Sequence, residues 1–182
     1  MKYFTRELWL APNQKDESVQ LQATRQFREN CVEYQKQLQN ILPRLDEADR
    51  HFFLEESLHD GRLIAFIAGD EIDFDFDSGS AFDINAHNTS VRMKVLGCNL
   101  DTVFTLEYAG VRRAVFDYPT EDPLFHYEGA YIGDWGYDEL TAVDNAYLRH
   151  EVLFASGTSV LIEFKKFSHN RLQFEGKRYN QS

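Results

Sequence analysis

The sequence predicts an α+β protein in which an N-terminal helical segment packs on an antiparallel β-sandwich-like domain. Up to about residue 57, apolar residues recur every three or four positions, which is the spacing of an amphipathic helix. After residue 58 they recur in short runs or at every second position, as in strands, and helical spacing does not return. We therefore expect residues 1–57 to form an arm and a helical segment, and residues 58–182 to form the β domain of one compact unit.

The helical segment follows a short opening stretch. Apolar and polar residues alternate over residues 1–10, which fits a short strand or an extended arm before Pro12. From about Asp16 the apolar side chains follow a helical spacing, and we expect an amphipathic helix of about 25 residues. Pro43 lacks a backbone N–H, so this helix should stop or kink there, and residues 44–53 fit a second, shorter helix.

The β domain is predicted from short runs of Phe, Val, Ile, Leu and Tyr that are separated by Gly, Asp and Asn. The expected strands cover residues 62–68, 71–77, 90–97, 102–108, 112–116, 139–143, 147–155 and 159–167. Hairpin turns are indicated by Gly69-Asp70, Ala109-Gly110 and Ser156-Gly157. The absence of intervening helical patterns argues against a parallel sheet with a nucleotide crevice.

Charge and composition exclude several classes of function. The 19 Lys and Arg residues against 30 Asp and Glu residues give a net charge of −11, which disfavours binding to nucleic acids or anionic membranes and favours a basic partner. No apolar run reaches the roughly 18–20 residues of a membrane span. The opening residues carry charges throughout and resemble no secretory signal, so a cytoplasmic location is expected. Cys31 and Cys98 lack a Cys-x-x-Cys spacing and are expected to be buried, reduced thiols.

Two motifs carry side chains that could do chemistry. His59-Asp60 could provide a general base or a metal ligand, with Glu55 and Glu56 nearby in sequence. The alternative is that Asp60 forms the turn that enters the first strand, and we favour this interpretation. The run of alternating Asp and Phe over residues 73–79 resembles a calcium loop, but its sixth and twelfth positions lack the required glycine and glutamate. Its alternation instead favours a half-buried antiparallel strand, and no metal site is predicted.

Acidic and aromatic residues are concentrated in two segments without any Lys or Arg. Residues 114–148 contain eight acids and eight aromatics, and residues 70–83 contain six further acids. Such loops can simply solubilise the chain and pack on the core, but Tyr and Trp flanked by carboxylates also suit recognition of a basic protein. The expected anchors and steering charges of this partner-binding surface are Tyr127, Tyr131, Trp135, Tyr137, Glu121, Asp122, Glu128 and Asp134.

A family resemblance follows from four stretches of sequence, at residues 1–8, 58–64, 104–111 and 161–165. The opening Met-Lys-Tyr-Phe-Thr-Arg-Glu-Leu resembles the start of a bacterial family of domain-of-unknown-function proteins with a helical N-terminal part and a β-rich remainder. The other three stretches are similar to a pattern of that family and of small immunity-type proteins of bacterial toxin systems. The chain departs from this pattern in having Gly61 where a small Ala or Ser is expected, and in its long stretch over residues 117–138.

The sequence therefore predicts a non-catalytic protein-binding module without a cofactor. The resemblance implies an immunity or inhibitor protein that would occlude a basic toxin or nuclease. The alternative is an enzyme or a metal-dependent activity centred on His59 and Asp60. A third reading is a self-assembling protein that pairs through an edge of the sandwich.

Overall fold

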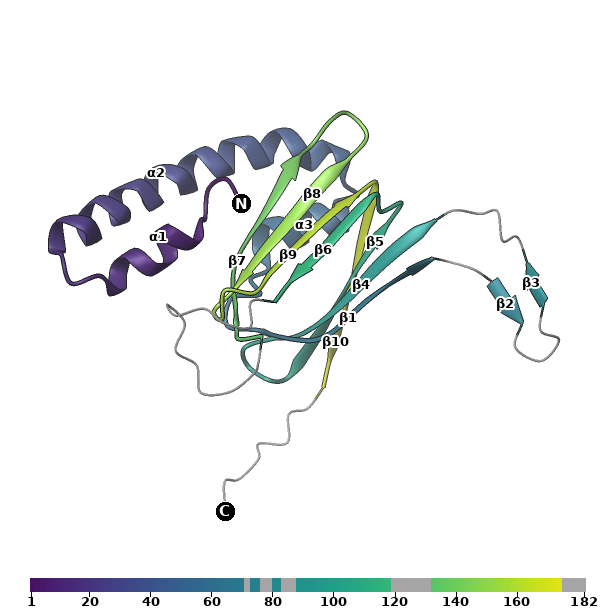
Figure 1. Cartoon of the computed structure of the whole chain (residues 1–182). Helices are drawn as coiled ribbons and strands as arrows, with labels where there is room; N and C mark the ends of the chain where they lie inside the picture. Colours follow the sequence, from purple (N-terminus) through teal and green to yellow (C-terminus); the bar gives the residue numbers. More distant parts are fainter. Residues whose placement is uncertain (71–72, 76–79, 83–87, 119–131, 175–182) are drawn as a thin grey trace, which may run out of the picture.

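The computed structural model describes residues 1–70, 73–75, 80–82, 88–118 and 132–174. Within residues 1–57 the chain forms three α-helices and two short 3-10 helices. They are α1 (Arg6–Leu10), η1 (Ala11–Asn13), α2 (Glu17–Ile41), η2 (Leu42–Arg44) and α3 (Glu47–Glu55). Figure 1 shows α1 and α2 lying side by side as a helical hairpin along one sheet.

The opening stretch differs from its prediction as a strand or extended arm. Residues 6–10 are helical, because the side chain of Thr5 accepts a hydrogen bond from the Leu8 N–H and so caps α1. Only residues 1–5 remain as an arm, and this arm is held by a carboxylate of the β domain, that of Glu139. Alternation over ten residues was too short a pattern to separate a strand from one helical turn.

The long helix matches its prediction closely. Asp16 caps α2 by accepting a hydrogen bond from the Ser18 N–H at 2.8 Å. Pro43 lies in the first turn of η2, where its missing N–H breaks no hydrogen bond, and α2 accordingly ends at Ile41. The second predicted helix is α3, so the helical part of the expected fold class is confirmed.

The β domain contains two four-stranded antiparallel sheets and a small hairpin. The first sheet has the order β1 (Arg62–Asp70), β4 (Thr89–Leu96), β5 (Thr102–Ala109) and β10 (Lys166–Gln173). The second has the order β6 (Arg113–Asp117), β9 (Ser159–Phe164), β8 (Leu148–Phe154) and β7 (Trp135–Ala142). The hairpin pairs β2 (Asp73–Asp75) with β3 (Ser80–Phe82), beyond the far ends of β1 and β4 (Figure 1).

Two bent strands connect the large sheets. β5 continues through residues 110–112 into β6, and β9 continues through Lys165 into β10, so the same two stretches pair in both sheets. The single strand expected over residues 159–167 is therefore two strands. Ala109-Gly110 carries the chain between sheets and makes no hairpin, and Gly69-Asp70 lies inside β1, where Asp70 pairs with Thr89. The hairpin at Ser156-Gly157 is confirmed, since it joins β8 to β9.

The inner faces of both sheets and the helices share one apolar core. Met93 and Leu106 of the first sheet and Ile162 of the second sheet are fully buried. The rings of Tyr108 and Phe164 meet across the two sheets at 5.0 Å between centroids. Leu38 of α2 and Phe52 of α3 belong to the same buried cluster, so the helices complete the core of the β domain.

The four edge strands of the two sheets differ in what packs against them or pairs with them. α2 packs on β7 and α3 packs on β10. β1 forms one isolated bridge, between Arg62 and Asp134, the residue just before β7. In the described part of the chain β6 pairs with β9 on one side and with no strand on the other.

The two cysteines differ in their exposure. Cys98 is exposed, so its predicted burial is wrong: it lies in the turn between β4 and β5 rather than on a strand face. Cys31 is half-buried on α2, and burial raises the pKa of its thiol. Among the helices that the structure describes, none is long and apolar enough to cross a membrane.

Candidate functional site

The expected partner-binding surface is only partly within the described residues. Tyr127, Tyr131, Glu121, Asp122 and Glu128 lie outside them. The other three residues stand at the start of β7 or just before it.

Trp135 is a core residue, and its prediction as an exposed anchor is wrong. Its side chain is 1% exposed, and its indole Nε1–H donates to the Asp138 carboxylate at 2.9 Å. The ring meets Phe154 edge-on at 5.5 Å between centroids. The prediction failed because Trp135 stands at an inward position of β7, which the sequence pattern had placed in a loop.

Tyr137 lies on the other face of β7, under the helical hairpin. Its ring contacts those of Phe4, Trp9 and Phe27, at centroid distances of 5.4, 4.9 and 5.4 Å. Burial raises the pKa of its hydroxyl. Tyr137 therefore contributes packing between the helices and the sheet, and it is half-buried rather than presented as a free anchor.

His59 and Asp60 form the turn that leads into β1. Asp60 has a left-handed backbone with φ of 62°, and its N–H donates to the Trp135 carbonyl at 2.9 Å. His59 Nδ1 lies 3.1 Å from Asp60 Oδ1, with both side chains well exposed. A Cβ on Gly61 would lie 2.8 Å from the Leu58 carbonyl oxygen, which explains why glycine stands where Ala or Ser was expected. These contacts confirm the turn.

The two candidate regions meet at one corner, which we call the β1–β7 junction (residues 59–62 and 134–137). The Trp135 N–H donates to the Gly61 carbonyl at 2.7 Å. Arg62 Nε donates to Asp134 Oδ1 at 3.2 Å. The structure thus places the His59-Asp60 turn beside the start of β7, more than seventy positions later in the sequence.

A cavity of about 750 Å³ opens beside this junction, between β1 and β6. Its lining residues are Arg62, Leu63, Ile64, Phe116, Tyr118, Ile132, Gly133 and Asp134. A register shift in β1 between Leu63 and Ala65 leaves Ile64 out of the ladder, and its side chain is 54% exposed. The cavity therefore has apolar walls and one ion pair at its margin, a composition suited to binding.

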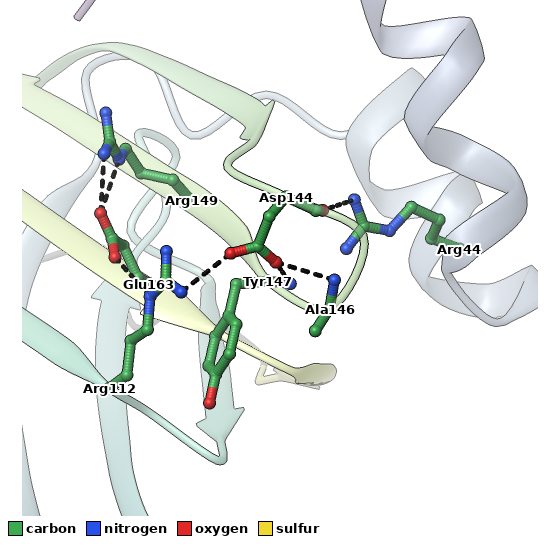
Figure 2. A network of polar contacts seen from close by, with 7 residues as sticks. All are labelled: Arg44, Arg112, Asp144, Ala146, Tyr147, Arg149 and Glu163. Carbon is green, nitrogen blue, oxygen red and sulfur yellow. Dashed lines mark hydrogen bonds and ion pairs between the residues drawn. The ribbon is translucent and has the colours of Figure 1, made fainter.

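A polar network lies at the end of the second sheet that is away from the β1–β7 junction (Figure 2), and it was not predicted from the sequence. Glu163 of β9 accepts hydrogen bonds from Arg112 Nε at 2.8 Å and Arg149 Nη2 at 2.7 Å. Arg112 also donates to Asp144 at 2.9 Å and lies over the ring of Tyr147 at 4.1 Å. Burial raises the pKa of Glu163, but the two arginines outweigh it and hold that pKa below its ordinary value.

The same network reaches the helical segment, because Arg44 donates to the carbonyl oxygen of Asp144 at 2.9 Å. Backbone N–H groups of Ala146 and Tyr147, together with Arg112, lower the pKa of the Asp144 carboxyl. Every carboxylate drawn in Figure 2 accepts hydrogen bonds within the network, so we interpret it as structural. No local motif could have revealed it, since its members come from separate elements.

A second polar group is enclosed between the sheets. Tyr108 Oη lies 2.6 Å from His150 Nδ1, and His150 Nε2 lies 3.2 Å from Asp138 Oδ2. Tyr108 and His150 are at most 1% exposed, so substrate cannot reach them. Burial raises the pKa of Tyr108 well above its ordinary value. The described residues contain no group of three or more His, Cys, Asp or Glu side chains placed to hold a metal ion.

Comparisons with known proteins add no relative. No family model, no curated protein and no solved structure matched the chain. The resemblance to a domain-of-unknown-function family and to immunity-type proteins therefore stays a prediction.

Proposed function

We propose that this protein is a non-catalytic protein-binding module whose partner binds at the cavity between β1 and β6. The main support is the contrast between two gaps of the β domain. At the gap beside β10, Phe52 and Phe53 of α3 fill the space, with ring centroids 5.6 and 4.9 Å from that of Phe167. At the gap between β1 and β6, the cavity exposes the apolar side chains of Ile64 and Phe116. Apolar walls of this kind are typical of sites that receive a side chain of a partner.

The charge of the chain supports a basic partner. Asp117 ends β6 and Asp134 precedes β7, so two carboxylates stand near the cavity, while Asp70 ends β1 at the other end of that strand. The two segments that follow β1 and β6 contain acids without any Lys or Arg. Carboxylates around an apolar contact would mainly accelerate association with a cationic surface.

Inhibition by occlusion is the form of this function that the family resemblance implies. The partner would then be a basic toxin or nuclease, and the protein would act in the cytoplasm of a bacterial cell. Saturating amounts of the protein should then suppress the activity of the purified partner. An enzyme that keeps full activity in the complex would contradict inhibition and leave only binding.

Selective capture tests the binding proposal. The wild-type protein and the variants Ile64→Ser and Leu172→Ser would be immobilised and exposed to host lysate, and the bound proteins identified by mass spectrometry. Leu172 is the control, because it is a strand residue of similar exposure, 67% against 54%, on β10. We expect a basic protein that binds the wild type and Leu172→Ser but binds Ile64→Ser at least tenfold more weakly. Equal capture by all three proteins would contradict the proposed cavity.

A second candidate function is a metal-dependent activity at His59 and Asp60. It is favoured by their 3.1 Å contact, but the described residues place no third His, Cys, Asp or Glu ligand beside them. Thermal unfolding with and without Ca²⁺, Mg²⁺ or Zn²⁺ tests this alternative, because a bound ion raises the melting temperature. A rise that His59→Ala abolishes would support it, and unchanged melting with all three ions would contradict it.

A further inference from the structure

β6 is an edge strand with unusual exposure. All five of its residues are exposed, and Val115 and Phe116 each keep 38% of their surface open. Within the described residues, β9 pairs with one side of β6, and the N–H and C=O groups of the other side pair with no strand. Proteins usually protect such an edge, because it is ready to pair with another strand. Of the other edge strands, β7 packs against α2 and β10 against α3, and β1 is bridged to Asp134 at its first residue, Arg62.

The sequence of β6 is complementary to itself. In antiparallel pairing centred on Val115, Arg113 faces Asp117 of the second strand, and Ala114 faces Phe116. The first pair joins opposite charges, and the second joins a small side chain to a large one. Both kinds of cross-strand pair stabilise a sheet. By symmetry each pair occurs twice, which is the property of an interface with twofold symmetry.

The neighbouring network leaves Arg113 available for such a pair. Glu163 is the register partner of Arg113 on β9. Its two carboxylate oxygens, however, accept hydrogen bonds from Arg112 at 2.8 Å and Arg149 at 2.7 Å (Figure 2). Asp117 faces Ser159, which carries no charge. Neither Arg113 nor Asp117 has an ion-pair partner within the described residues, although both are exposed.

We propose that β6 pairs with β6 of a second copy, so that the second sheet continues across a twofold axis at Val115. The interface would cover the exposed Val115 and Phe116 and would pair Arg113 with the partner's Asp117 in both directions. A second copy fits better than an unrelated strand, because the charge order of β6 complements its own reverse. This proposal goes beyond the binding function and does not rest on it. Because Phe116 also lines the cavity between β1 and β6, dimerisation and partner binding would compete for this side chain.

Charge reversal tests the proposed register. Wild-type protein would be measured by sedimentation equilibrium from micromolar to millimolar concentration, together with Arg113→Asp and Asp117→Arg. Each variant places like charges opposite each other twice, and we expect its dimer dissociation constant to rise by about tenfold or more. An equimolar mixture of the two variants should dimerise again, because every Asp then faces an Arg. Native mass spectrometry would identify this dimer as the heterodimer.

Lys94→Asp is the matched control, since it changes the net charge as Arg113→Asp does, at an exposed position of β4. Its dimerisation should equal that of the wild type. Circular dichroism would show that all variants are folded. A wild type that remains monomeric at millimolar concentration would overturn the proposal. A dimer that ignores both reversals, or that Lys94→Asp weakens equally, would also overturn it.

Cross-linking tests the axis directly. In a Cys98→Ser background, Val115→Cys places two thiols opposite each other at the twofold axis, within the Cα separation that a disulfide spans. Mild oxidation should give a covalent dimer of Val115→Cys but not of Leu172→Cys, whose thiol would be more exposed and lie on β10. Equal cross-linking of both variants would contradict a specific β6 interface.

Discussion

At the residue scale, His150 shows how a polar side chain is tolerated between the sheets. It is 1% exposed, and each ring nitrogen lies within hydrogen-bond distance of a partner, Tyr108 on one side and Asp138 on the other. Burial raises the pKa of Asp138, but hydrogen bonds from His150 and Trp135 and the charge of His150 outweigh it and lower that pKa. Asp138 is therefore held as a carboxylate by its neighbours.

The lowered pKa predicts a pH-dependent stability. In the unfolded chain an Asp has a pKa of about 3.9, so between the folded and unfolded pKa values the unfolded chain binds more protons. The contribution of Asp138 is present above about pH 4 and is lost as the pH falls through the folded pKa. Asp138→Asn should cost about 1–2 kcal/mol at pH 7, and less below pH 4. Urea unfolding across this pH range measures the difference, and a difference that does not vary with pH would contradict the prediction.

At the element scale, two contacts attach the N-terminal helices to β7. The ring of Trp9 lies directly on Gly136, where a Cβ would overlap its atoms. Glu139 is fully buried, and its carboxylate accepts backbone hydrogen bonds from Lys2, Tyr3 and Phe4 at 2.7, 2.6 and 2.5 Å. The arm and α1 are therefore positioned by a glycine and a carboxylate of one strand.

Gly136→Ala should displace Trp9. The added methyl group would also lie 2.8 Å from the Leu153 carbonyl, so either α1 or β7 must shift. We expect a loss of about 1–3 kcal/mol in the free energy of unfolding and a change in tryptophan fluorescence. Gly69→Ala is the control, because nothing lies within 4 Å of its added Cβ. Equal stability of the two variants would show that Trp9 does not pack on Gly136.

Glu139→Gln should release the arm. The amide keeps one acceptor oxygen but turns N–H donors toward the backbone N–H groups of the arm, which leaves buried donors without acceptors. We expect a loss of about 2–4 kcal/mol, and faster hydrogen exchange in residues 2–10 than in the wild type. Glu107→Gln, at an exposed ion pair with Arg92, should cost less than about 1 kcal/mol. Unchanged exchange in residues 2–10 would argue against Glu139 as the anchor.

In the whole molecule, residue 57 marks the change from helices to strands, but the helices and the sheets share one hydrophobic core. Leu38, Ile41, Leu45 and Phe52 belong to the same buried cluster as the strands of both sheets. Removing residues 1–57 would expose the apolar surface of β7 and β10 that α2 and α3 cover.

A fragment of residues 58–182 should therefore fail to fold cooperatively. We expect a broad thermal transition without a defined midpoint and strong binding of a hydrophobic dye, in contrast to the full chain. Differential scanning calorimetry and dye fluorescence measure both properties. A sharp transition of the fragment would show that the β domain has a core of its own.

The fold class and most elements can be predicted from local sequence patterns, because the period of apolar residues and the chemistry of turns depend on neighbouring residues. The period of apolar residues predicts α2 and the central strands, and Pro43 predicts the end of the long helix. The glycine turn at residues 156–157 predicts the β8–β9 hairpin for the same reason. These features depend on neighbouring residues, so no partner from elsewhere in the chain is needed to specify them.

The surroundings of each side chain, in contrast, depend on the tertiary fold. An aromatic residue among acids looks alike in sequence whether it is an anchor or core, and Trp135 became core because β7 turns it toward the first sheet. The β1–β7 junction and the pairing of Glu163 with Arg112 and Arg149 join residues from separate strands. Such contacts arise from strand order and register, which depend on long-range pairing that local patterns do not encode.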